Sequence, residues 1–137
     1  MGTQQLFLLV LGIVIVGVAV IAGVSSFRQQ SKANQADDAL SRTVRIAQEA
    51  VNWRGRAEAF GGGGGGAFDD LATDGMEKLG IGESPAYTVH GIQSASGRVI
   101  EIVGVSTLDP EVGAYVRVNG NTIDSTATRL DGSITLP

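Results

Sequence analysis

The stretch LFLLVLGIVIVGVAVIAGV, residues 6–24, decides how the rest of this sequence is interpreted. Its nineteen residues include no charged or polar side chain, and fourteen of them are Leu, Ile, Val or Phe. As a helix with a rise of about 1.5 Å per residue it is roughly 28 Å long, close to the ~30 Å hydrocarbon core of a bilayer. The large apolar side chains together favour insertion by about 4–8 kcal/mol. The pattern therefore predicts a transmembrane helix near the N-terminus.

Two other interpretations of residues 6–24 fit less well. A buried helix that is apolar all round needs a large surrounding core, and no other part of this chain could wrap it. A cleaved secretory signal has basic residues ahead of a shorter apolar region, whereas residues 1–5 contain no Lys or Arg. We therefore expect the segment to be retained. The first cations, Arg28 and Lys32, follow the span, so the positive-inside rule alone places the C-terminal part in the cytoplasm, and a basic leader would reverse that.

Residues 25–60 change to the pattern of an amphipathic helix. Apolar residues recur at spacings of three and four and form two adjoining stripes: Ala33, Ala36, Leu40, Val44, Ala47 and Val51, and beside them Ala39, Ile46, Ala50, Trp53 and Ala57. Neither this part nor the apolar stretch contains proline. We expect one helix from about residue 3 to about residue 58, with a length of about 80 Å. A coiled-coil stalk is the alternative, but the seam is short and rich in alanine.

An uninterrupted glycine run follows the predicted helix. It consists of Gly61, Gly62, Gly63, Gly64, Gly65 and Gly66. A phosphate-binding loop is excluded, because no Gly-Lys-Ser/Thr follows and no strand precedes the run. The run is either a flexible linker or a closely packed backbone that leaves no room for side chains, and we expect the packed form.

The C-terminal part changes to the period of two that is typical of β-strands. A short helix over residues 68–79 precedes it, and strands are predicted at residues 87–92, 98–106, 114–118, 121–125, 126–130 and 133–136. Asn119-Gly120 and Asp131-Gly132 are hairpin signals. The expected fold class is α+β, with a long N-terminal helix over residues 1–60, a connecting region over 61–86 and a small antiparallel sheet over 87–137.

The composition excludes several kinds of function. The 137 residues include no cysteine and a single histidine, His90, so neither a thiolate site nor a multi-histidine metal site can form. A net charge of −4 and an aromatic content of 5% argue against nucleic-acid binding. We expect no enzyme and no catalytic, cofactor or metal site. His90 is expected to be an ordinary strand residue, and the acidic residues within 69–77 a solvated face.

The layout resembles that of a bacterial type IV pilin or a type II secretion pseudopilin. Both have an apolar helix that starts almost at the first residue, continues as an amphipathic helix and is followed by a sheet. The opening Met1-Gly2-Thr3-Gln4-Gln5-Leu6, together with the run at 61–66, is similar to pilin-like proteins that begin Met-Gly-x-Gln-Gln-Leu. Gln5 stands where most of the family has an acidic residue, and the disulfide common near the family's C-terminus cannot form.

The resemblance implies a structural subunit of an extracellular type IV pilus-like filament that is inserted in the inner membrane before assembly. Its partners would be further copies of itself and the pilus assembly machinery, and its N-terminal assembly contact would involve Met1 and Gln5. The residues expected to pack helix against helix are Leu6, Leu9, Gly12, Val16, Gly17, Ala19 and Gly23. Ala19 and Gly23 have the small-xxx-small spacing that lets helices approach closely.

Charge also divides between the two halves of the chain. Residues 25–60 carry six Lys or Arg against four Asp or Glu, a net +2, and residues 61–137 carry four against ten, a net −6. A basic helix and an acidic sheet region can attract each other within or between subunits. Two alternative functions remain open: a minor pseudopilin of a secretion machine, and a single-pass membrane protein with a small extracytoplasmic binding domain.

Overall fold

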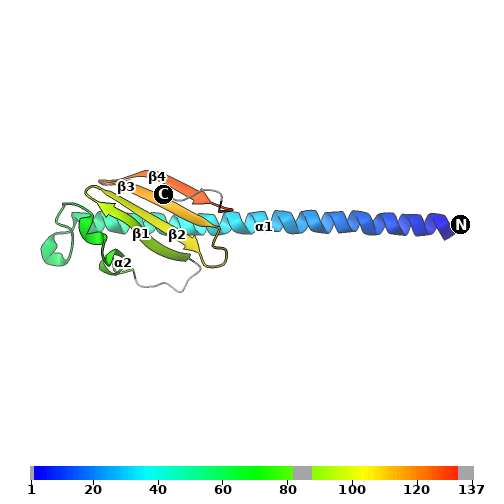
Figure 1. The fold of residues 1–137 in the computed structure, drawn as a ribbon, viewed down its shortest axis with the longest axis horizontal. Coiled ribbons are helices and arrows are strands. Elements are labelled where there is room, and N and C mark those ends of the chain that lie inside the picture. The colour runs from blue at the N-terminus through cyan, green and yellow to red at the C-terminus, as the bar shows by residue number, and fades with distance from the viewer. Residues whose placement is uncertain (1, 82–87, 133–137) are drawn as a thin grey trace. The chain divides into compact units, whose positions relative to one another are not determined.

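A computed structural model describes residues 2–81 and 88–132 (Figure 1). It has the predicted α+β layout, in which one long N-terminal helix is followed by a four-stranded antiparallel sheet. The helices and strands are α1 (Gly2–Gly55), α2 (Gly75–Lys78), β1 (Thr88–Ser96), β2 (Val99–Ser106), β3 (Gly113–Asn119) and β4 (Thr122–Arg129), with short 3-10 turns at Glu58–Phe60 and Asp69–Leu71.

The chain divides into two compact units, Met1–Ala33 and Asn34–Pro137. Within the part that the structure describes, the first unit is entirely helical, and no residue from Gly2 to Gln30 is buried. The second unit contains the C-terminal part of α1, the turns, α2 and the sheet. All of the buried hydrophobic residues belong to this second unit. It is therefore the only one of the two with a core among the described residues.

The sheet is a simple meander whose order, β1-β2-β3-β4, follows the sequence. Its hairpins at the ends of β1 and β3 have two-residue loops that start with glycine. Ser96 pairs with Val99 around Gly97-Arg98, and Asn119 pairs with Thr122 around Gly120-Asn121. Gly97 and Gly120 have φ values of 57° and 66°. A glycine with positive φ at the first loop position is typical of the type II′ turn, which suits the twist of a hairpin.

The core of the second unit lies between one face of α1 and one face of the sheet. Helix residues from Ala36 to Trp53 are buried at helical spacing. Opposite them, alternate residues of β2 are buried, and in β3 all residues are buried except Arg117 and Asn119. The register pairs Ile100 with Val118 and Ile102 with Val116, so that four large side chains share this inner face. Phe68 and Leu71, from the segment before α2, complete the same cluster.

Side-chain size changes along this interface. At one end Gly104 pairs with Ala114, and a Cβ atom on Gly104 would lie 2.7 Å from the Thr43 hydroxyl oxygen of α1. Thr43 is buried and donates its hydroxyl hydrogen to the carbonyl oxygen of Ala39 at 2.6 Å. At the other end Ile46, Ala50 and Trp53 meet the large Ile and Val residues. Small residues therefore allow a close approach of helix and strand at one end, and large residues fill the other.

Several predicted boundaries differ from those found. α1 ends at Gly55, a few residues earlier than expected, because Ala57 is extended and the chain turns back on itself. The predicted helix over 68–79 is instead a 3-10 turn and the one-turn helix α2, interrupted by Asp74 in a left-handed conformation. The predicted strands 121–125 and 126–130 form one strand, β4, with a bulge near Asp124. The predicted strand 133–136 and the start of the one at 87 lie outside the described residues.

Candidate assembly surface

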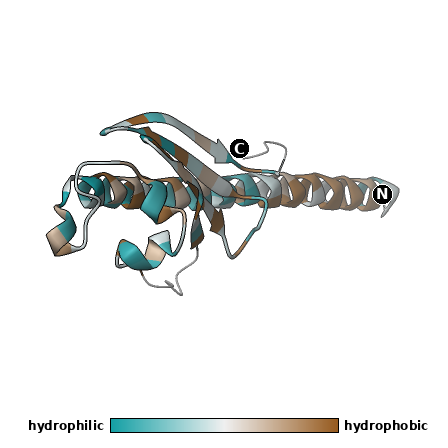
Figure 2. Ribbon diagram, turned by 60° about the vertical axis from the view of Figure 1, so that its left-hand side comes forward, coloured by the Kyte–Doolittle hydropathy of each residue, from teal (hydrophilic) through white to brown (hydrophobic). Residues whose placement is uncertain are grey.

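The apolar stretch at residues 6–24 forms a continuous part of α1 with no internal cover. All fourteen of its large apolar side chains are between 48% and 74% exposed. Its most apolar 18-residue window has a mean hydropathy of 3.1 and no buried residue. Figure 2 shows hydrophobic colour around the whole of this helix segment rather than on one stripe. By length and composition it can cross a membrane, and it needs an apolar surrounding, because water would contact every face of it.

The small residues of this helix segment are open to a neighbour. A Cβ atom added at Gly12, Gly17 or Gly23 would meet nothing within 4 Å. At 100° per residue, Gly12, Val16, Ala19 and Gly23 lie within about 60° of one another on the helix surface, with Leu9 at the edge of this strip. Two helices that meet along such a strip can bring their backbones close together.

Other predicted contact residues are placed differently. Gly17 and Leu6 lie roughly 120–140° around the helix from Gly12, so they belong to a second face. Gln5 lies in the first turns of α1 and is exposed, whereas Met1 is outside the described residues. A helix in the middle of a bundle needs more than one contact face, so two faces suit a bundle better than a dimer.

The glycine run folds back over the C-terminal end of α1. The amide nitrogens of Gly63 and Gly65 donate to the carbonyl oxygens of Trp53 and Arg54 at 2.9 and 2.6 Å, and that of Gly64 donates to Arg56 at 2.9 Å. The carbonyls of Trp53 and Arg54 are among the last four of α1, which the end of a helix leaves without an intrahelical partner, and Arg56 directly follows the helix. Gly61, Gly64 and Gly65 have positive φ values, which other residues adopt at a cost. The run thus serves as an extended C-terminal cap of the helix.

Two neighbouring side chains hold the run in place. The ring of Trp53, a buried residue, lies beneath Gly63, where an added Cβ atom would be 2.7 Å from the ring edge. The guanidinium of Arg54 donates to the Gly66 carbonyl oxygen at 2.7 Å and lies 5.3 Å from the centre of the Phe68 ring. The run is therefore packed within its own chain, an arrangement whose partners the glycine pattern alone does not reveal. Whether it also contacts another copy stays a prediction.

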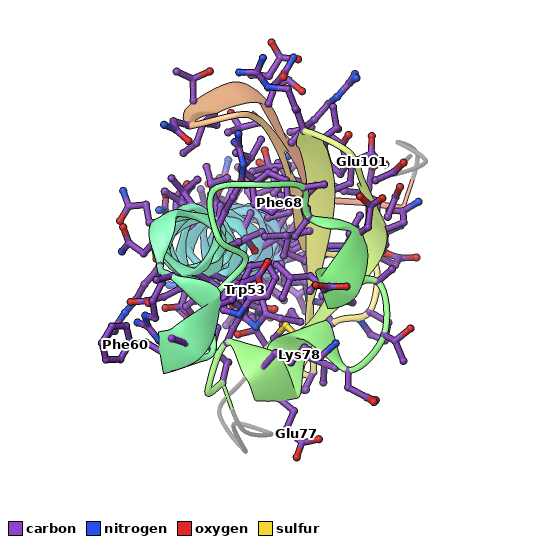
Figure 3. The ribbon with its side chains drawn as sticks, turned by 90° about the vertical axis from the view of Figure 1, so that its left-hand side faces the viewer. Trp53, Phe60, Phe68, Glu77, Lys78 and Glu101 are labelled. Carbon is purple, nitrogen blue, oxygen red and sulfur yellow. The ribbon has the colours of Figure 1, made fainter. Side chains whose placement is uncertain are left out.

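Phe60 is an exposed aromatic side chain that the sequence pattern did not single out. It ends the 3-10 turn Glu58–Phe60 and is 78% exposed, whereas Phe68, at the other end of the run, is fully buried. Figure 3 shows Phe60 directed away from the ribbon and Trp53 directed into it. Its exposure could have been predicted from its position directly before six glycines, because glycines offer it no side chains to pack against.

The second unit contains one histidine, His90, and an acidic segment within residues 69–77. Among residues 2–81 and 88–132, no group of three or more His, Asp or Glu could hold a metal ion. Burial lowers the pKa of His90 below its ordinary value of 6.5, and the nearby Arg42 charge acts in the same direction. The acidic segment has structural contacts instead, because the Asp69 carboxylate accepts a hydrogen bond from the Gly97 amide at 3.0 Å.

Comparisons with known proteins do not identify a family. No protein-family model matches the chain, and no curated protein or solved structure is significantly similar to it. The function is therefore inferred from the exposed apolar helix and from the unit that follows it.

Proposed function

We propose that this chain is the structural subunit of an extracellular filament of the type IV pilus kind. The observation that carries the proposal is the apolar segment of α1, which has no buried residue in its most apolar window. Such a surface is stable only in a bilayer or against other apolar surfaces. Before assembly the segment would span the inner membrane, and after assembly it would lie in a central bundle made of many copies.

The residues along this helix segment support a bundle of identical helices. It contains no Asp, Glu, Lys or Arg, so a change from lipid to protein surroundings need not desolvate a charge. The strip of Gly12, Val16, Ala19 and Gly23 offers one close contact, and Gly17 offers a second on another face. The pilus assembly machinery would move each subunit from the membrane into the filament.

The second unit would form the outer part of the filament. Residues 25–60, which run from the first unit into the second, carry a net +2, whereas residues 61–137 carry a net −6. Attraction between the basic part of one copy and the acidic part of the next would set their orientation. The function proposed here is structural, and it assigns no catalytic step to the chain.

Filament formation can be tested with the full chain in a bacterial host that has a pilus assembly system. Sheared surface material should contain abundant filaments made of this chain, and cells without the assembly system should retain it in the membrane fraction. Electron microscopy and mass spectrometry of both fractions provide the measurement. A chain present only in trace amounts would indicate a minor pseudopilin. A chain found only as a detergent-soluble monomer would indicate a single-pass membrane protein and contradict the proposal.

A further inference from the structure

Phe60 has the properties of an anchor residue in a protein interface. It is the most exposed of the large hydrophobic residues of the described chain, at 78%, and the two residues before it, Glu58 and Ala59, are also exposed. Its backbone is fixed, because the amide of Phe60 donates to Ala57 and that of Gly61 to Glu58, both at 2.9 Å. An aromatic side chain on a fixed turn loses little conformational entropy when it binds, and aromatic residues dominate interface energies.

A groove elsewhere on the same unit has a suitable shape and composition. It lies between α2 and β1, has a volume of about 670 Å³ and is lined by the apolar residues Leu71, Met76 and Ile92. Gly75 forms part of its wall, and a Cβ atom there would overlap the side chain of Ile92. The glycine therefore lets Ile92 pack directly against α2 in the wall of the groove. The volume of the groove is ample for one phenyl ring.

Charges around the two features are of opposite sign. The segment that contains the Phe60 turn, residues 54–66, carries two cations, Arg54 and Arg56, against one anion, Glu58, a net +1. The Arg54 guanidinium is held at Gly66 and Phe68, so the exposed Arg56 is the cation available to a neighbour. The segment that forms the groove, residues 69–78, carries four anions, Asp69, Asp70, Asp74 and Glu77, against one cation, Lys78, a net −3. Asp74 and Glu77 line the groove itself. Opposite charges around an apolar contact favour encounter and fix its orientation.

We propose that Phe60 of one copy inserts into the groove between α2 and β1 of the next copy. Figure 3 shows Phe60 and Glu77 directed to different sides of the unit, so one copy can use both surfaces at once. Because the two surfaces differ, the contact is head-to-tail and can repeat without limit. This inference rests on the proposed filament, and it assigns the contact that links the second units of neighbouring subunits.

Crosslinking tests this contact directly, since the chain has no cysteine of its own. Ala59 lies beside Phe60, and Ala72 lines the groove; both are exposed. In sheared filaments of the Ala59→Cys/Ala72→Cys variant, a short bis-maleimide should give a ladder of covalent multimers. Ala59→Cys alone should give no ladder, and neither should Ala59→Cys/Ser125→Cys, whose second site is exposed on β4. Normal filaments without a ladder from the first pair, or with an equal ladder from the β4 pair, would overturn the contact but leave the filament proposal intact.

Substitutions test its energetic importance. Phe60→Ala should raise the concentration needed for assembly by about tenfold, as expected for loss of an interface anchor, whereas Phe60→Trp should keep most of the assembly. Arg56→Glu and Glu77→Arg should each weaken assembly, and the double variant should regain it, because the charges are then exchanged. The fluorescence of Trp53, the one tryptophan of the wild-type chain, reports whether the alanine and charge variants are folded, and circular dichroism reports it for Phe60→Trp, which has a second tryptophan. Folded Phe60→Ala chains that assemble like wild type would overturn the inference. Complete absence of filaments from the wild-type chain would instead overturn the filament proposal and this contact with it.

Discussion

Gly62 illustrates how a single residue allows the chain to fold back over the end of α1. A Cβ atom at this position would overlap the carbonyl and the Cβ atom of Arg56. Backbone atoms cannot move aside as a flexible side chain can, so Gly62→Ala should destabilise the second unit by about 1–3 kcal/mol. Gly55→Ala is the matched control, because nothing lies within 4 Å of its added Cβ atom, and it should be neutral or stabilising. Urea unfolding in detergent, followed by Trp53 fluorescence, would show this, and equal midpoints for the two variants would contradict it.

His90 makes the stability of the chain depend on pH. Burial, with a smaller effect of Arg42, lowers its pKa in the folded chain below the ordinary 6.5, although contacts with Ala39 and Asp38 oppose this. The unfolded chain therefore binds the proton more readily, and stability falls as the pH drops below about 6.5. His90→Gln should reduce the loss of stability between pH 7 and pH 5. Unfolding midpoints at both pH values measure it, and an unchanged pH dependence in the variant would contradict it.

At the residue scale, the sequence predicted the glycine run to be packed but did not reveal its partners. The contacts of Gly63 with Trp53 and of Gly66 with Arg54 depend on how sharply the chain turns after Gly55, which no local pattern specifies. The sequence pattern also did not predict that Phe60 is exposed and Phe68 is buried, because both residues lie close to an end of the same run. Their burial depends on which side of the run lies against the sheet.

At the scale of elements, periodicity predicted the long helix and most of the strands, and the differences arise at their ends. The hairpin after β3 was expected to turn at Asn119-Gly120, but the loop is Gly120-Asn121. The observed loop requires positive φ only at the glycine, whereas the expected one requires it at Asn119 as well. The predicted break after residue 125 is replaced by a bulge, because pairing with β3 continues on both sides of it.

The contact between α1 and β2 depends on Gly104. A Cβ atom there would lie 2.7 Å from both the Thr43 hydroxyl oxygen and a ring carbon of His90. Gly104→Ala should therefore push the helix and the sheet apart and cost about 1–3 kcal/mol of unfolding free energy. Gly91→Ala is a suitable control, since it lies on the neighbouring strand with nothing within 4 Å. Thermal unfolding monitored by circular dichroism measures both, and the prediction is wrong if Gly104→Ala unfolds at the same temperature as wild type.

At the scale of the whole molecule, the apolar helix segment should fail in both of its proposed surroundings if it acquires a charge. Val16→Asp places a carboxylate near its centre, at a cost of about 2.5–3.5 kcal/mol for membrane insertion. In a filament the same cost recurs in every subunit, and the segment has no Lys or Arg to offset it. Membrane fractionation and electron microscopy should show loss of insertion and of filaments. Val16→Leu should behave as wild type, and normal filaments from Val16→Asp would contradict the role of the helix.

Removing the segment should have a different result. A chain of residues 25–137 retains every buried hydrophobic residue of the described structure, all of which lie at or beyond Ala36. It should therefore be folded, monomeric and soluble without detergent, with Trp53 still buried. Analytical ultracentrifugation and circular dichroism provide the measurement. If the truncated chain forms the same filaments as the full chain, the helix is not their core.

The continuity of α1 has a mechanical consequence. The helix has no proline, and its buried face from Ala36 to Trp53 covers between four and five turns. A pull along the helix axis would load all of these contacts in shear at once, rather than peel them apart one by one. The glycine cap adds its hydrogen bonds to Trp53 and Arg54 at the far end of the same element. A helix held in this way can bear tension without first separating from the sheet.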